Sequence, residues 1–262
     1  MLAALVVGMV FVKIEYFPHI TQLKELMGVY SLIGFVLSLL LVFRTNTAYD
    51  RWWEGRKKWG ELVNNTRNLA IKVGAITDDP EIEDFFSRMI PNYAFAMKEH
   101  LRDGVNLEEL ELKPEERAKL EGKGHIPSHI AKMMYERFQV MKANGQLTQE
   151  EFLSIDVNLK TFSDIIGACE RIKNTPIPYS YNNFFKKFIF VYVTTMPLAF
   201  VDLFSYGAVA ISLFLFYVLV SMEILAEEIE DPFGTDDNDL PTQGLSEKIR
   251  DNVQEMLPKM EG

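Results

Sequence analysis

The residues of this sequence whose spacing most clearly suggests a function are apolar. Phe35, Leu39 and Phe43 recur every four residues, which on a helix places them on one face over roughly 12 Å. Several copies of such a helix around one axis would form stacked apolar rings. Rings of this kind pass ions when hydrated and block them by dewetting. The same spacing also fits side chains that face lipid or pack against a neighbouring helix.

The polar residues form no pattern typical of an active site. Neither Cys169 nor any group of Ser, His and Asp residues has the arrangement of a nucleophile and its base. His125 and His129 are four residues apart, but Pro127 between them argues against a helical metal-binding pair. We therefore predict that the protein is not an enzyme. Because the only cysteine is Cys169, no internal disulfide forms, and the soluble part is expected in a reducing compartment.

Composition also argues against nucleic-acid binding. The net charge is −10, and the sequence has no basic arm, no glycine-rich phosphate loop and no zinc-type Cys/His spacing. These are the features that such proteins generally need.

Four apolar runs are the elements that would position the candidate residues: 1–12, 27–43, 188–201 and 203–222. Run 27–43 has no charge, and its seventeen residues at about 1.5 Å each span roughly 26 Å, close to the thickness of the hydrocarbon core of a bilayer. A soluble buried helix is the alternative for this run. Run 1–12 is short for a span, so we expect it to tilt, to end early or to continue from residues upstream. Asp202 alone separates the last two runs, which predicts a turn there.

Basic residues flank these runs on one side of the expected membrane: Lys57, Lys58, Lys186 and Lys187. Basic flanks are typical of the cytoplasmic side. Four spans place both termini and the charged middle of the chain on that same side. We therefore predict a multi-pass protein of the inner (plasma) membrane with both termini in the cytoplasm.

The charged middle of the chain is expected to form an all-helical soluble layer. Thr148-Gln149-Glu150-Glu151 is a capping box that opens a helix, and no alternating strand pattern or solenoid repeat occurs. The predicted fold class is therefore all-α, with four transmembrane helices and a large cytoplasmic helical region. One integrated domain is expected in four parts: 1–45 with the first and second membrane helices, 46–180 as the cytoplasmic helical region, 181–226 with the third and fourth membrane helices, and 227–262 as an acidic cytoplasmic tail.

Three stretches of the sequence resemble the bestrophin family, most closely its bacterial branch. Phe43-Arg44-Thr45-Asn46, with the AYDRWWEGR of residues 48–56 and then Trp59-Gly60, is similar to the signature after the second membrane helix of that family. The other two are Pro176-Ile177-Pro178-Tyr179 and the Asp231-Pro232-Phe233-Gly234 stretch with the acidic residues that follow it. Together they cover nearly the whole chain in order. The resemblance implies a homopentamer whose central pore passes chloride and other monovalent anions, or sodium and other cations as bacterial relatives can.

The resemblance also implies roles for individual residues. Phe35, Leu39 and Phe43 fall where the family places the neck of its pore. Ile177 would form a second constriction, the cytoplasmic aperture, and a rigid linker into the membrane is the alternative for its segment.

The acidic tail resembles the calcium-binding cluster of eukaryotic bestrophins. By that resemblance Asp236 and Asp239 would supply side chains, and Glu228 and Asp231 backbone oxygens. Oxygen ligands on a short loop suit a hard cation. Asp231, however, stands where the eukaryotic cluster has Asn. We predict no cofactor, and calcium remains the alternative to a solvated or pore-facing acidic cluster.

Two other classes of function stay open, a secondary transporter and a non-conducting membrane scaffold. A transporter is expected to show an inverted repeat or paired interrupted helices, and neither is found. The expected partners are further copies of the chain, the lipid bilayer and monovalent ions. The sign of the ion is open, because Glu223, Glu227 and Glu230 would raise the local cation concentration if they faced a pore.

Overall fold

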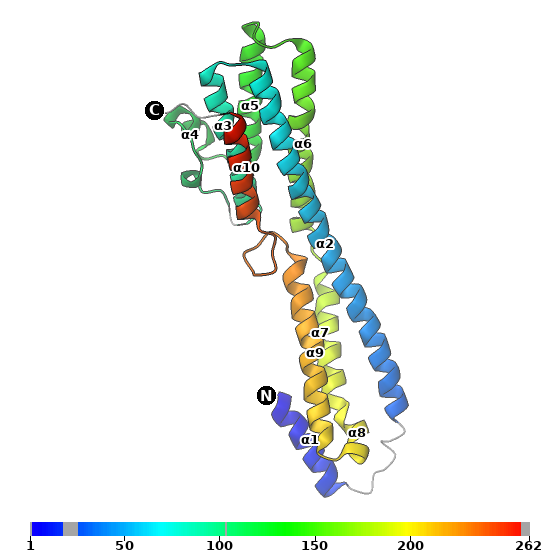
Figure 1. The fold of residues 1–262 in the computed structure, drawn as a ribbon. Coiled ribbons are helices and arrows are strands. Elements are labelled where there is room, and N and C mark those ends of the chain that lie inside the picture. The colour runs from blue at the N-terminus through cyan, green and yellow to red at the C-terminus, as the bar shows by residue number, and fades with distance from the viewer. Residues whose placement is uncertain (1, 18–25, 103, 258–262) are drawn as a thin grey trace. The chain divides into compact units, whose positions relative to one another are not determined.

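The structure, a computed structural model, describes residues 2–17, 26–102 and 104–257. Every regular element in these ranges is a helix, which confirms the all-α fold class (Figure 1). The helices are α1 (Leu2–Tyr16), α2 (Leu26–Ile76), α3 (Pro80–His100), the short 3-10 helix η2 (Leu107–Glu109), α4 (Pro114–Leu120), α5 (Ile126–Ala143), α6 (Gln149–Asn174), α7 (Tyr179–Thr195), α8 (Pro197–Phe204), α9 (Gly207–Glu230) and α10 (Thr242–Met256).

The chain divides into two compact units, each built from two separate segments. Unit 1 comprises Met1–Arg51 and Pro176–Glu230, and so holds α1, the first part of α2, and α7 to α9. Unit 2 comprises Trp52–Thr175 and Asp231–Gly262. Helix α2 contributes to both units, because it does not end where the apolar run ends at Phe43 but continues without a break to Ile76.

Unit 1 contains the apolar helices. Three segments within the described residues are long and apolar enough to cross a membrane: the first part of α2, Tyr179–Phe204 (α7 with α8) and α9. Helix α1 has 15 residues and is not among them. The membrane character of the chain is therefore confirmed, whereas a total of four spans stays a prediction.

The core of unit 1 is formed where α2, α7 and α9 meet. Leu37 and Leu41 of α2 are buried together with Phe185 and Ile189 of α7 and Leu219 of α9. These residues come from opposite ends of the sequence, so the membrane part of the fold depends on long-range packing.

The turn expected at Asp202 lies further along the chain, at Ser205 and Tyr206. Ser205 has a positive φ of 50°, and Asp202 stays inside α8. Its carboxylate accepts a hydrogen bond from the ammonium group of Lys13 in α1 at 3.1 Å, and both side chains are largely buried. Because its charge is paired with Lys13, Asp202 remains in the helix. The prediction of a turn at this residue is therefore wrong.

The core of unit 2 is rich in aromatic residues. Tyr93 and Phe162 lie in contact, and the hydroxyl of Tyr93 donates to the carbonyl of Phe162 at 2.7 Å. Burial raises the pKa of this hydroxyl. Cys169 is buried in the same core, and burial raises the pKa of its thiol to about 12, so its thiolate is not available at neutral pH.

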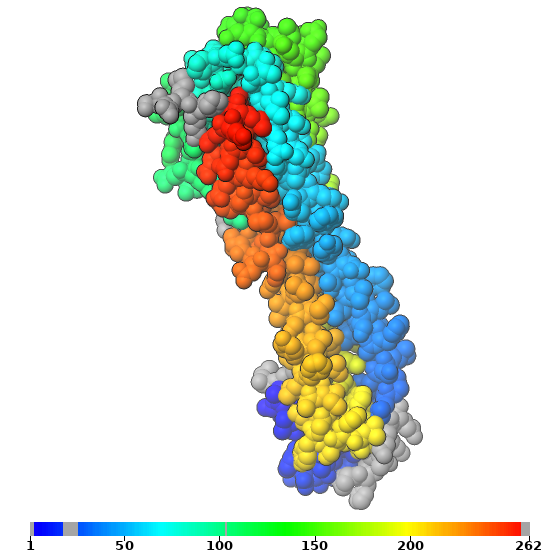
Figure 2. Space-filling view, viewed as in Figure 1, coloured from blue at the N-terminus to red at the C-terminus, as the bar shows by residue number. Residues whose placement is uncertain are grey.

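The helix ends of unit 2 follow local sequence signals. Thr148 is the N-cap of α6, and its hydroxyl accepts from the N–H of Glu151 at 3.2 Å, while the Glu151 carboxylate accepts from the N–H of Thr148 at 2.8 Å. The predicted capping box is therefore confirmed. Helix α10 lies on the surface of unit 2 against α3 (Figure 2). Its own residues Ile249 and Val253 are buried.

Candidate functional site

The three residues expected at a neck lie on an exposed face of α2. Phe35 is 67% exposed, Leu39 45% and Phe43 57%, whereas Leu37 and Leu41 on another face are buried in the core of unit 1. The helix therefore presents one apolar face to its own chain and a second apolar face outward. An apolar face of this extent is covered in the native state, either by lipid or by other copies of the chain.

A buried arginine follows directly after Phe43. Arg44 is 1% exposed, and its guanidinium donates to Glu230 Oε2 at 2.7 Å, while its Nε lies 3.9 Å from Glu223 Oε2. The two glutamates are seven residues apart in α9, which is two helical turns, so both face α2. A buried charge needs such partners because it has lost its hydration.

The same glutamate holds the segment that carries Ile177. Pro176 and Pro178 have no N–H group, and the N–H between them, that of Ile177, donates to Glu230 Oε1 at 2.7 Å. The Ile177 side chain is half-buried. The carboxylate of Glu230 therefore links the residue after Phe43 to the backbone of Ile177, all within unit 1.

A third contact fixes the position of Glu230 itself. The Nε of Arg51, the last residue of α2 in unit 1, donates to the main-chain oxygen of Glu230 at 3.0 Å. Two arginines of α2 thus hold the end of α9: Arg44 binds the side chain of Glu230, and Arg51 binds its main-chain oxygen. Ile177 and Arg44 lie in motifs that the sequence shows, whereas no sequence signal identifies Glu230 as the group that joins them.

The loop that follows α9 packs on α2 within unit 2. Phe233 and Leu240 are buried, and a Cβ atom added at Gly55 would lie 3.2 Å from both side chains. Trp52 donates its indole N–H to the carbonyl of Asn238 at 3.0 Å. The Trp-Trp-Glu-Gly stretch and the Pro-Phe-Gly stretch are therefore complementary, because Gly55 leaves the space that the loop occupies.

One acidic residue of this loop, Asp239, binds the loop's own backbone. Asp239 Oδ2 accepts from the N–H of Asp236 at 2.7 Å, and Oδ1 is buried without a hydrogen-bond partner among the described residues. Burial raises the pKa of the Asp239 carboxyl. Asp231 and the Asp236 side chain are exposed, and Glu228 lies in α9 in unit 1. The structure thus brings Asp236 and Asp239 together, and calcium binding by these four residues stays a prediction.

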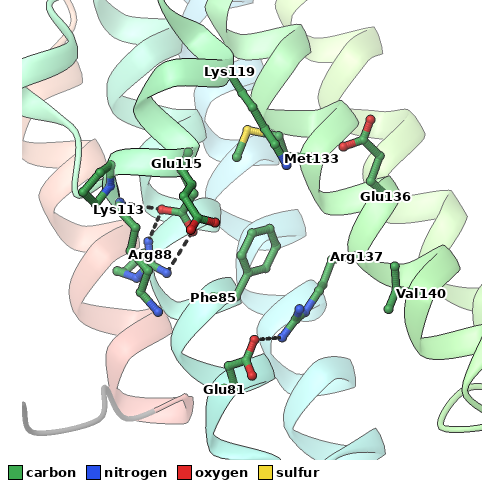
Figure 3. A pocket seen from close by; sticks show the side chains of 12 residues that line it. Glu81, Phe85, Arg88, Lys113, Glu115, Lys119, Met133, Glu136, Arg137 and Val140 are labelled. Atoms are coloured by element: carbon green, nitrogen blue, oxygen red, sulfur yellow. Dashed lines mark hydrogen bonds and ion pairs between the residues drawn. The ribbon is translucent and has the colours of Figure 1, made fainter.

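A pocket of about 580 Å³ in unit 2 is lined by α3, α4 and α5 (Figure 3). Two of its arginines are paired with nearby acidic side chains. Arg88 donates to Glu116 at 2.5 Å and to Asp84 at 3.1 Å, and Arg137 donates to Glu81 at 2.8 Å. Burial alone would raise the pKa of the Asp84 carboxyl, but the hydrogen bonds from Lys113 and Arg88 hold this pKa below its usual value. The Arg88–Glu116 pair fastens α4 to α3 and the Arg137–Glu81 pair fastens α5 to α3, and we assign the pocket a structural role.

Comparison with known proteins identifies the family. The model of the family described as bacterial/fungal bestrophin protein matches residues 1–255. A voltage-dependent anion channel-forming protein of Nostoc sp. is 34% identical over 228 residues, which are 84% of this chain and 74% of that protein. A voltage-dependent anion channel-forming protein of Escherichia coli is 30% identical over 254 residues, which are 96% of this chain and 83% of that protein.

Solved structures identify the same family. The crystal structure of a bacterial bestrophin homologue from Klebsiella pneumoniae superposes with a TM-score of 0.87 at 26% identity, covering 98% of each chain. A point variant of that homologue gives a TM-score of 0.85 with the same identity and coverage. The chain therefore belongs to the bestrophin family of membrane channel proteins and is not an enzyme.

Proposed function

We propose that this chain forms an anion channel whose pore passes between several copies of the first part of α2. Relatives whose names describe them as voltage-dependent anion channel-forming are matched over 74% and 83% of their own lengths. The observation on this chain that carries the proposal is the outward apolar face of α2, where Phe35, Leu39 and Phe43 are exposed whereas Leu37 and Leu41 on another face are buried.

The proposed neck is the ring formed by these three side chains. None of them offers a polar group that could replace the hydration shell of an ion, so the neck would conduct only when wide enough to hold water. Rings require a closed rotational assembly, and the family resemblance implies five copies. We therefore propose a homopentamer.

The proposed aperture is Ile177. Its flanking prolines restrict the backbone, and the bond from its N–H to Glu230 fixes the segment further. Because Glu230 also binds Arg44 beside Phe43, the neck and the aperture would be mechanically connected through one carboxylate.

In this arrangement residues 1–45 and 181–226 carry four spans of the inner membrane. Residues 46–180 form the cytoplasmic helical region and 227–262 the cytoplasmic tail, so both termini lie in the cytoplasm. The short α1 would be the fourth span, and the buried pair of Lys13 with Asp202 supports its place beside α8.

The charges of α9 support anions rather than cations as the permeant species. Glu223 and Glu230 are buried and face Arg44, and Glu227 is paired with Lys186 at 2.7 Å. The three glutamates that would concentrate cations are therefore each close to a basic group, which reduces their field.

Two measurements on the purified protein test the proposal. Light scattering in mild detergent should give about five chains per particle, and a monomer or dimer would contradict the pore. In planar bilayers, single-channel steps are expected, whereas slow saturable flux would indicate a transporter and silence a scaffold. Under a tenfold KCl gradient, the reversal potential should approach about 59 mV in magnitude, with the sign of the chloride equilibrium potential. The opposite sign would mean a cation channel.

A further inference from the structure

Two histidines and a glutamate that are far apart in the sequence meet in unit 2. His100 is the last residue of α3, His125 is the N-cap of α5, and Glu170 lies in the last part of α6. Glu170 Oε1 lies 2.7 Å from His100 Nε2 and 3.0 Å from His125 Nε2, and the two rings are in contact with centroids 4.4 Å apart. Within the described ranges, no other group of His, Cys, Asp and Glu brings three potential ligand atoms within 4.8 Å of one another.

The chemistry of this group matches a metal site with an open position. Two imidazole nitrogens and one carboxylate oxygen are the ligand set of zinc sites in which water or another molecule completes the coordination. Imidazole ligands favour zinc and neighbouring transition metals over calcium and magnesium. The side chains are only partly buried, with 22%, 36% and 31% exposed for His100, His125 and Glu170, so water can reach the remaining coordination positions.

The present distances are close to those that a metal requires. Ligand atoms 2.0–2.2 Å from a zinc ion at tetrahedral angles lie about 3.3 Å from one another. The two Nε2–Oε1 distances of 2.7 and 3.0 Å would have to open by about 0.6 and about 0.3 Å. Small rotations of half-exposed side chains supply such a change without moving the helices.

The position of the proton on His125 differs between a hydrogen-bonded cluster and a metal site. His125 Nδ1 accepts from the N–H of Ser128 at 3.2 Å, so in the metal-free protein the proton lies on Nε2 and points to Glu170. Coordination through Nε2 moves this proton to Nδ1 and ends the capping contact with Ser128. One N-cap contact is small beside a metal–imidazole bond, so the exchange favours the metal when it is available.

We infer that His100, His125 and Glu170 bind a divalent transition-metal ion, with zinc as the best match. The ion would join the end of α3, the start of α5 and α6, three elements of unit 2 whose connections are long in sequence. None of its three residues is a proposed pore residue, so failure of the metal site would leave the channel proposal untouched.

The test uses the full-length protein without a polyhistidine tag, purified in mild detergent and treated with EDTA. Zinc is titrated in competition with a chromophoric chelator, and cobalt is added in parallel for its visible spectrum. We expect one zinc per chain, and a cobalt spectrum typical of mixed nitrogen and oxygen ligands that zinc abolishes. The melting temperature should rise with zinc by mass action.

Matched variants assign the site. His100→Ala and Glu170→Gln should each weaken zinc binding by more than about 100-fold, the most that loss of a residue that only hydrogen-bonds to a ligand generally causes. His129→Ala removes a half-buried imidazole from the same helix as His125, and Asp164→Asn removes an exposed carboxylate from the same helix as Glu170. Both controls should bind zinc like the parent.

The inference is overturned if the parent binds no zinc at micromolar concentration, or if the ligand variants bind as tightly as the parent. A cluster that is only hydrogen-bonded would show variants of lower melting temperature and a parent whose melting temperature zinc does not change. Should a ligand variant aggregate on size exclusion, the cobalt spectrum of the parent decides alone, because a spectrum without imidazole ligation contradicts the site.

Discussion

Replacing Glu230 by glutamine should weaken the link between α2, α9 and the Ile177 segment. The amide oxygen can still accept from the N–H of Ile177. The amide NH2 group cannot accept from Arg44, which in the parent donates to the Glu230 carboxylate at 2.7 Å. Loss of one partner of a buried ion pair generally costs about 3–5 kcal/mol. Glu223, with an oxygen 3.9 Å from Arg44, retains part of the compensation, so we expect about 2–3 kcal/mol, within the range for a charged hydrogen bond.

The matched control is Glu227→Gln, one turn earlier on the same helix. Its partner is Lys186 at 2.7 Å, but the Glu227 side chain is 55% exposed whereas that of Glu230 is 9% exposed. An exposed pair contributes about 0–1 kcal/mol. Both substitutions remove the same charge, so a difference between them reports the burial of Glu230 together with its contacts to Arg44 and Ile177.

The assay is thermal unfolding in detergent, followed by the loss of the assembled particle, with single-channel recording on the same preparations. A loss of about 2–3 kcal/mol lowers the melting temperature of a chain of this size by roughly 5–10 °C, and Glu227→Gln should lower it by about 4 °C or less. Glu230→Gln should also change the gating of the aperture. Equal effects of the two substitutions, or an unchanged melting temperature for Glu230→Gln, would refute the reasoning.

Three further predictions concern unit 2. Gly55→Val should destabilise the protein by about 1–3 kcal/mol through overpacking, because a Cβ at Gly55 would lie 3.2 Å from two buried side chains of the acidic loop. Gly244→Ala, whose Cβ would meet nothing within 4 Å, should instead stabilise α10 by about 0.5–1 kcal/mol, and calorimetry compares the two variants. Asp84→Asn should destabilise at pH 7, and because the folded pKa of Asp84 lies below its usual value of 3.8, the difference from the parent should shrink as the pH falls below about 4. Submillimolar calcium should leave the melting temperature unchanged; a rise that the Asp236→Asn, Asp239→Asn double variant abolishes would instead establish calcium binding by the loop.

The features that could be predicted from the sequence are those with local causes. The capping box of Thr148 depends on residues three apart, and the apolar face of Phe35, Leu39 and Phe43 follows from helical periodicity. The all-α membrane fold follows from long uncharged runs. Each of these signals is contained within a single helix.

The features that could not be predicted depend on residues brought together by the fold. Arg44 and Glu230 are 186 residues apart, and no spacing rule connects them. The sequence neighbour of His125 at helical spacing is His129, but its partners in the fold are His100 and Glu170, from other helices. A charge inside an apolar run, such as Asp202, gives some signal, since such a charge needs a partner, but the sequence does not say which residue supplies it.

The central claim is that the outward face of α2 lines the pore, and unitary current tests it most directly. Replacing Phe35, Leu39 and Phe43 together by alanine widens the proposed ring without adding or removing a charge. A bilayer recording of this triple variant beside the parent should show a larger single-channel conductance with little change in reversal potential. On a lipid-facing stripe the same changes would lower stability through lost packing. An unchanged unitary current in an intact oligomer would therefore contradict the account.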